Sequence, residues 1–173
     1  MEYFKSFFNY KKTIYIKSDL DDQAYLVKNT YNSKKAANLL SYLKNNILIL
    51  ICFLKNNLDK YQDKQEYISI LIEKIPKTVL SENDEAYYKS SYVVSKGKEI
   101  VLCLRNENDE FYDVNLLTFI MINLISLIAN PEIGHTNKFY DIFHFLIKIA
   151  IEIGIYHEID FSKYPIKNND III

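Results

Sequence analysis

Glycine, proline and arginine are all scarce in this chain of 173 residues. Three glycines and three prolines leave no linker that would divide it, so we expect one compact domain. Arginine occurs once, at Arg105, although lysine and arginine together number 21. Because guanidinium groups are the usual means of recognising phosphates and base edges, the shortage of arginine counts against nucleic-acid binding.

Cysteine is nearly absent as well. Cys52 and Cys103 are the two cysteines, and each lies in an apolar run. They form neither a CxxC motif nor the disulfide framework of a small secreted protein, so we expect two reduced core thiols. The net charge of −1 gives no general attraction to nucleic acid or to anionic lipid. These features predict an intracellular protein.

Long apolar runs are missing too. The longest, 116–129, is interrupted by Asn123 and is too short to cross a bilayer, so a buried helix is the better interpretation. Lysines and an asparagine interrupt the aromatic residues near Phe7, and we expect no signal peptide. The sequence therefore predicts no transmembrane segment.

The residues that remain predict a mixed fold. Alternating apolar residues predict strands at 13–17 and 24–27, and 92–94 with 100–104 predict a β-hairpin. Residues 80–90 are polar and predict a loop.

Apolar residues at helical spacing predict four helices. In chain order these are a helix from Asn32 or Ser33 to about Asn57, one from Asp63 to Pro76, one from Asp113 to Ala129, and one from Lys138 to Ile153, capped by Asn137 and ended by Gly154. The prediction is an α+β fold, mostly helical with one small β-sheet. It has an N-terminal segment 1–30 that contains strands, a main domain 31–166 and a tail 167–173.

The order of elements from Ser91 onward is the most specific pattern. A hairpin is followed by an acidic loop, an apolar helix, the pair Gly134-His135 and a long helix that ends at Gly154. This order is similar to that of the WLM-domain (Wss-like) zincin metallopeptidases, especially the forms carried by large DNA viruses. The resemblance covers 20–166 and implies a zincin-like fold.

In that family the apolar helix carries the motif HExxH, whose two histidines bind zinc and whose glutamate is the general base. The corresponding residues here are Asn123, Leu124, Ile125, Ser126 and Leu127. By the resemblance, Asn123 and Leu127 replace the two histidines, and Leu124 replaces the glutamate. His135 has the spacing of the third ligand. One ligand of three remains and the base is absent, so we expect neither zinc nor catalysis.

The resemblance also implies a peptide-binding edge. In zincins the strand beside the active-site helix lies at the edge of the sheet and receives an extended substrate by β-addition. The residues expected to form that edge strand here are Ile100, Val101, Leu102, Cys103 and Leu104. This capacity would survive the loss of zinc.

Other catalytic sites have less support. A relocated metal site could combine His135, His144 and His157 with Glu132 or Asp141, but no two of these histidines are close-spaced in the sequence.

Two nucleophiles are weaker still. Ser126 lies in an apolar helix, where serine usually bonds back to the preceding turn. No motif supports Cys103 and His135 as a Cys–His pair.

The sequence as a whole predicts a catalytically inactive metallopeptidase-like protein, a pseudoenzyme that acts as a structural or interaction protein of a large DNA virus. It would use no cofactor and would lie in the host cytoplasm or the virion. Its partner would be a protein, with viral structural proteins as candidates, rather than nucleic acid. Two alternatives stay open: a metallopeptidase with a metal site that the sequence does not reveal, and a DNA-associated viral protein.

Overall fold

The computed structural model describes residues 12–84 and 90–163. Its elements are β1 (Thr13–Lys17), β2 (Ala24–Lys28), α1 (Ser33–Asn56), the 3-10 helix η1 (Leu58–Lys64), α2 (Gln65–Lys74), η2 (Ile75–Lys77), β3 (Val79–Glu82), β4 (Tyr92–Val94), β5 (Glu99–Leu102), α3 (Val114–Ala129), α4 (Asn137–Glu152) and η3 (Phe161–Lys163). Four α-helices and one small sheet confirm the predicted α+β class. The predicted tail, 167–173, lies outside the described residues.

The sheet is mixed, with the strand order β1-β2-β3-β5-β4. Its two outer pairs are antiparallel, whereas β3 runs parallel to both β2 and β5. The loop predicted over 80–90 is therefore wrong at its start, because Val79–Glu82 is the central strand. The polar residues that suggested a loop are buried and paired: Ser81 Oγ donates to Glu99 Oε1 at 2.6 Å, and Glu82 pairs with Arg105.

The predicted edge strand is also wrong. Ile100, Val101 and Leu102 lie in β5, which pairs with β3 on one side and with β4 on the other. Cys103 and Leu104 come after the end of β5. Within the described residues the edges of the sheet are β1 and β4, because the unpredicted strand β3 takes the place beside β5 that the edge assignment required to be free.

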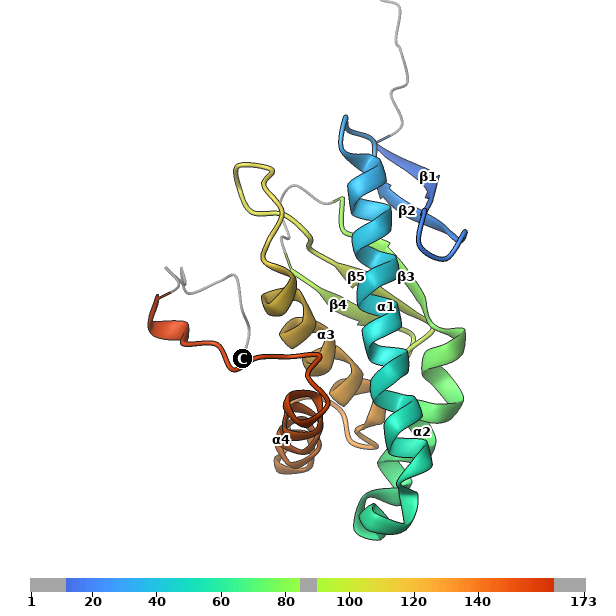
Figure 1. The fold of residues 1–173 in the computed structure, drawn as a ribbon, viewed down its shortest axis with the longest axis vertical. Helices are drawn as coiled ribbons and strands as arrows, with labels where there is room; N and C mark the ends of the chain where they lie inside the picture. The colour runs from blue at the N-terminus through green and yellow to red at the C-terminus, as the bar shows by residue number, and fades with distance from the viewer. Residues whose placement is uncertain (1–11, 85–89, 164–173) are drawn as a thin grey trace, which may run out of the picture.

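Helices cover the sheet in Figure 1, where α1 crosses β1, β2 and β3 and lies beside α3. The helix α3 also contacts β4, and α4 packs against α3 on the side away from α1. Rings hold the last pair together, since Phe119 of α3 and Phe143 of α4 meet edge to face at 5.4 Å between centroids. The two packed helices predicted over 113–129 and 138–153 are thereby confirmed.

The sole arginine lies inside this structure. The Arg105 side chain is fully buried, and its Nε donates to Glu82 Oε1 at 2.7 Å. Its Nη1 donates to Thr30 and Asn32, which precede α1. Asn32 occupies the N-cap position of α1, as expected, but its side chain accepts this bond and makes no capping bond to the helix. One buried cation thus joins the ends of β2, β3 and β5.

Two helix starts differ from prediction. Asp63 lies in η1 rather than at the cap of α2, which begins at Gln65. The η1 segment is tied to α4 through Lys64 Nζ, 2.5 Å from Asp141 Oδ2, and this hydrogen bond raises the pKa of Lys64. The cap of α4 is Thr136, not Asn137, because the threonine hydroxyl accepts from Phe139 N at 3.3 Å.

By length and hydropathy alone, α1 could span a bilayer. Half of its most apolar stretch is buried within the fold, where it packs on the sheet and on α2 and α3. A core helix of a water-soluble domain passes the same test, so the absence of a transmembrane segment stays a prediction.

A glycine fixes the β4–β5 turn on α3. Gly97 has φ +104°, and a Cβ there would lie 2.9 Å from Ile128 Cγ2. We expect Gly97→Ala to lower the free energy of unfolding by about 2 kcal/mol, through backbone strain and this clash together. The matched control is Gly154→Ala, where φ is +76° and the space is open; its cost should be about 1 kcal/mol. Urea unfolding measures both, and equal losses would show that the contact with Ile128 is unimportant.

Candidate functional site

The helix α3 carries the residues that the resemblance places at the zinc site. It begins where Asp113 Oδ1 accepts from Asn115 N at 2.9 Å, and it continues without a break to Ala129. Leu124 is buried in the core, while Asn123 and Leu127 are half-buried. The residues that the resemblance aligns with HExxH therefore lie on a regular helix, and they carry an amide and two leucines rather than imidazoles and a carboxylate.

The loop after α3 is built on Asn130. Its Nδ2 donates to Gly134 O at 3.1 Å, and its Oδ1 accepts from Glu132 N at 3.1 Å. These bonds hold a short loop against the end of α3, and Gly134 supplies the positive φ of +85°. The next residue, His135, is exposed and packs edge to face on Phe139 with 4.5 Å between ring centroids. That His135 faces Asn123 and Leu127 stays a prediction.

These residues do not fit a zinc ion. A catalytic zinc needs three protein ligands, and a single exposed imidazole supplies one. Across 12–84 and 90–163, no three His, Cys, Asp or Glu side chains lie close enough to hold a metal. The relocated site proposed from the sequence also lacks support: His144 is exposed on α4 beside Tyr140, and Asp141 pairs with Lys64. No catalytic step through a metal follows from this arrangement.

The remaining sequence candidates have structural roles. Ser126 is fully buried, and its hydroxyl donates to Ile122 O at 2.7 Å, as predicted for a serine in an apolar helix. Cys103 Sγ lies 3.3 Å from Arg105 O. The main chain of His157 is bound at the start of α3, where its N–H donates to Asn115 Oδ1 at 2.8 Å.

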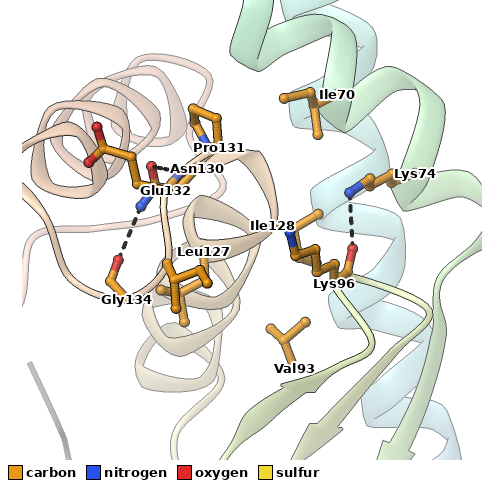
Figure 2. A pocket seen from close by; sticks show the side chains of 11 residues that line it. Ile70, Lys74, Val93, Lys96, Leu127, Ile128, Asn130, Pro131, Glu132 and Gly134 are labelled. Atoms are coloured by element: carbon orange, nitrogen blue, oxygen red, sulfur yellow. Dashed lines mark hydrogen bonds between the residues drawn. The ribbon is translucent and has the colours of Figure 1, made fainter.

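A pocket lies beside the former site. It has a volume of about 320 Å³ and opens between β4, the β4–β5 turn, the end of α2, the end of α3 and the loop that follows (Figure 2). Its lining residues are Ile70, Lys74, Val93, Lys96, Leu127, Ile128, Asn130, Pro131, Glu132, Ile133 and Gly134. Leu127, which the resemblance aligns with the second histidine, thus shares a pocket with Gly134 and with the edge strand β4.

Sequence reasoning missed most of this pocket. Lys74 and Lys96 are 22 residues apart in the chain, so no local sequence pattern places them together. In the structure Lys74 Nζ donates to Lys96 O at 3.2 Å, which ties α2 to the hairpin turn. The one feature of the sequence that pointed to this part of the pocket was the Lys96-Gly97 pair in the turn of the predicted hairpin.

Two viral proteins are similar to this chain in sequence. The uncharacterized protein R325 of Acanthamoeba polyphaga mimivirus is 37% identical over 172 residues, which cover 96% of this chain and 87% of that protein. The uncharacterized protein 136R of Invertebrate iridescent virus 6 is 35% identical over 81 residues, 45% of this chain and 43% of that protein. No protein-family model matches the chain.

Among solved structures, Wss1 from Saccharomyces cerevisiae aligns with a TM-score of 0.51 and 20% identity, covering 74% of this chain and 87% of Wss1. At that identity the likeness shows a shared fold. It agrees with the metallopeptidase-like fold expected from the order of elements after Ser91. With that fold, and with R325 matched over nearly its whole length, the chain belongs to the family of large-DNA-virus proteins that includes R325 of Acanthamoeba polyphaga mimivirus.

Proposed function

We propose that this protein is a catalytically inactive member of the metallopeptidase-like fold and acts by binding another protein. One observation carries the proposal: α3 has an amide and two leucines at 123, 124 and 127, where the resemblance places two metal ligands and a general base. The relatives belong to large DNA viruses, so the protein would act in an infected host cell or in the virion. Viral structural proteins are candidate partners.

The type of replacement supports binding rather than altered catalysis. Leu124 is 4% exposed and belongs to the apolar core, so its position now stabilises the helix instead of presenting a base. A leucine neither ligates a metal nor accepts a proton. The fold, the pocket and the edge strand remain, and these can hold a polypeptide without chemistry.

Zinc content tests the proposal. We expect purified protein, dialysed against zinc and then against zinc-free buffer, to retain far less than one zinc per chain by atomic emission. His135→Ala is the matched control, because it removes the one surviving ligand and should leave the small zinc content unchanged. One tightly bound equivalent that disappears in His135→Ala would refute the loss of the metal site.

The edge strand β4 offers the surface for binding. In the described part of the chain β4 pairs with β5 along one side, and no strand pairs with its other side. Because N–H and C=O groups alternate in direction along a strand, the outer side can accept an extended segment as a sixth strand. With three residues this edge is short, so backbone pairing alone would bind weakly, and the neighbouring pocket has to contribute affinity.

Binding to DNA has less support. Sequence-specific proteins usually read base edges and grip phosphates with arginine, and the only arginine here is fully buried in an ion pair. Lysines remain at the surface, but the net charge is −1. A mobility shift with single-stranded DNA that weakens steeply with salt would favour this alternative.

A further inference from the structure

The pocket beside β4 has the size and the lining to receive one large side chain. Its volume of about 320 Å³ lies at the lower end of the range for small-molecule sites, roughly 300–1,000 Å³. Val93, Leu127 and Ile128 contribute apolar surface to it, and Ile133, which is 89% exposed, lies at its rim. Polar side chains, among them Lys74 and Lys96, line the same hollow, so its apolar side chains can hold an apolar group next to polar ones.

The walls of this pocket are held in place before any partner arrives. The hydrogen bond from Lys74 to Lys96 O joins α2 to the turn, and the close approach of Gly97 to Ile128 seats the same turn on α3. On the opposite wall, Asn130 holds the loop through Gly134. A preformed pocket costs little ordering on binding, which favours affinity.

A second hollow adjoins the first and carries positive charge. Its volume is about 440 Å³, and its lining residues are Glu73, Lys74, Lys77, Ser95, Lys96, Gly97 and Lys98. Lys74 and Lys96 line both hollows, which makes the surface continuous. Four lysines face two glutamates over the two hollows, on a chain whose overall charge is −1. In Figure 2 the Glu132 side chain extends on the side of the pocket opposite Lys74.

The lining favours a peptide over a nucleic acid. Among the described residues, no aromatic ring or histidine lines either hollow, so these walls give unpaired bases no surface on which to stack. Lysine ammonium groups act as point charges that suit single carboxylates as well as phosphates. A pocket lined both by apolar side chains and by Lys74 and Lys96 matches a polypeptide segment whose apolar side chain has acidic neighbours.

We infer that the partner segment bound along β4 carries one large apolar residue, seated against Val93, Leu127 and Ile128, and acidic residues beside it that face Lys74, Lys77, Lys96 and Lys98. The inference rests on the proposed interaction function and names the chemistry of its partner. Pairing with the short edge of β4 orients the bound segment, and the pocket provides apolar contact. The lysines favour acidic residues beside the apolar one and speed association.

Fluorescence polarisation with three labelled synthetic peptides tests the inference. The first has a central leucine flanked by aspartates, the second replaces that leucine with alanine, and the third replaces the aspartates with lysines. We expect the first to bind the intact protein most tightly, and the second to bind on the order of tenfold more weakly because it leaves the pocket empty. We expect no binding of the third, and steady weakening of the first as salt rises.

Variants locate the binding surface. The double variant Lys77→Glu, Lys98→Glu should weaken the first peptide on the order of tenfold, whereas the matched control Lys55→Glu, Lys148→Glu, with the same net charge, should not. Ile133→Ser should weaken the leucine peptide and leave the alanine peptide unchanged. The four substituted lysines are exposed and do not line the pocket beside β4. Ile133 is exposed as well, so every variant should fold.

Several outcomes would overturn the inference. If both double variants bind the first peptide equally, Lys77 and Lys98 play no part in binding. If oligothymidylate binds more tightly than the first peptide at the same lysines, the surface is a nucleic-acid site. Failure of all three peptides would exclude peptide docking in this pocket. Amide exchange separates these results from the proposed function. Val93 is the β4 residue whose N–H points away from β5, so a lysine-flanked peptide that protects the Val93 amide would keep β4 as a binding edge and refute only its preference for acids. Zinc content tests the loss of catalysis independently.

Discussion

Replacing Arg105 with methionine should lower the free energy of unfolding by about 3–5 kcal/mol, the largest loss expected from any single substitution in this protein. The guanidinium and the Glu82 carboxylate are both fully buried, and the other carboxylate oxygen accepts from Lys28 N at 2.8 Å. Without the arginine, an unpaired carboxylate would stay in the core or take up a proton. The bonds to Thr30 and Asn32 would be lost as well.

Two further variants separate the charge from the contacts. Arg105→Met combined with Glu82→Leu removes both charges, and we expect it to regain part of the loss because an apolar pair leaves no buried ion. Asp109→Asn is the control, since Asp109 is half-exposed at 3.2 Å from Arg105 Nη1 and should cost under about 1 kcal/mol. Urea unfolding followed by circular dichroism gives all three values. If Arg105→Met lowers the free energy of unfolding no more than Asp109→Asn does, water must solvate Glu82 in the folded Arg105→Met variant.

Restoring the motif on α3 should produce the second large effect. We expect the triple variant Asn123→His, Leu124→Glu, Leu127→His to bind one zinc per chain, and we expect the natural chain to bind none. Two imidazoles at i and i+4 share one face of a regular helix, and His135 would supply the third ligand. The shared pocket of Leu127 and Gly134 indicates that the loop before His135 lies against the end of α3.

The matched control for the triple variant adds His135→Ala. Zinc affinity should fall by at least a factor of ten when that ligand is lost, while circular dichroism shows the same fold. Isothermal titration calorimetry measures both constants. If the triple variant folds but binds no zinc, the backbone of the natural protein has collapsed around Leu124 and Leu127 and no longer has the shape of a zinc site. If the control binds as tightly as the triple variant, His135 is not the third ligand and its predicted place facing Asn123 and Leu127 is wrong.

Elements with a local signature could be predicted well. The helix after Asp113 has its cap and its apolar spacing within one continuous segment, and the structure begins and ends it where expected. The hairpin from Tyr92 follows from β-branched residues on either side of a Lys-Gly turn. In each case the side chains that stabilise the element lie within a few residues of it, so a one-dimensional pattern contains the necessary information.

The central strand β3 could not be predicted for the opposite reason. Ser81 and Glu82 look like loop residues until Glu99 and Arg105 come beside them, and those partners lie 18 and 23 residues away. Missing β3 led directly to the mistaken edge at Ile100, because a strand is an edge only through the absence of a neighbour. The pocket lysines were missed likewise, since α2 and the hairpin turn meet only in the folded chain.

The absence of an HExxH pair from α3 was decided by the sequence alone, because the chain has no histidine between Glu110 and Asn130. The sequence also determined the helices, whose periodicity is local. Tertiary structure decided where the sole arginine resides, which strand forms the edge, and which apolar and basic side chains surround the pocket. These features depend on contacts between segments that are distant in the sequence. The arginine becomes buried, the strands pair and the pocket forms only when those segments pack together.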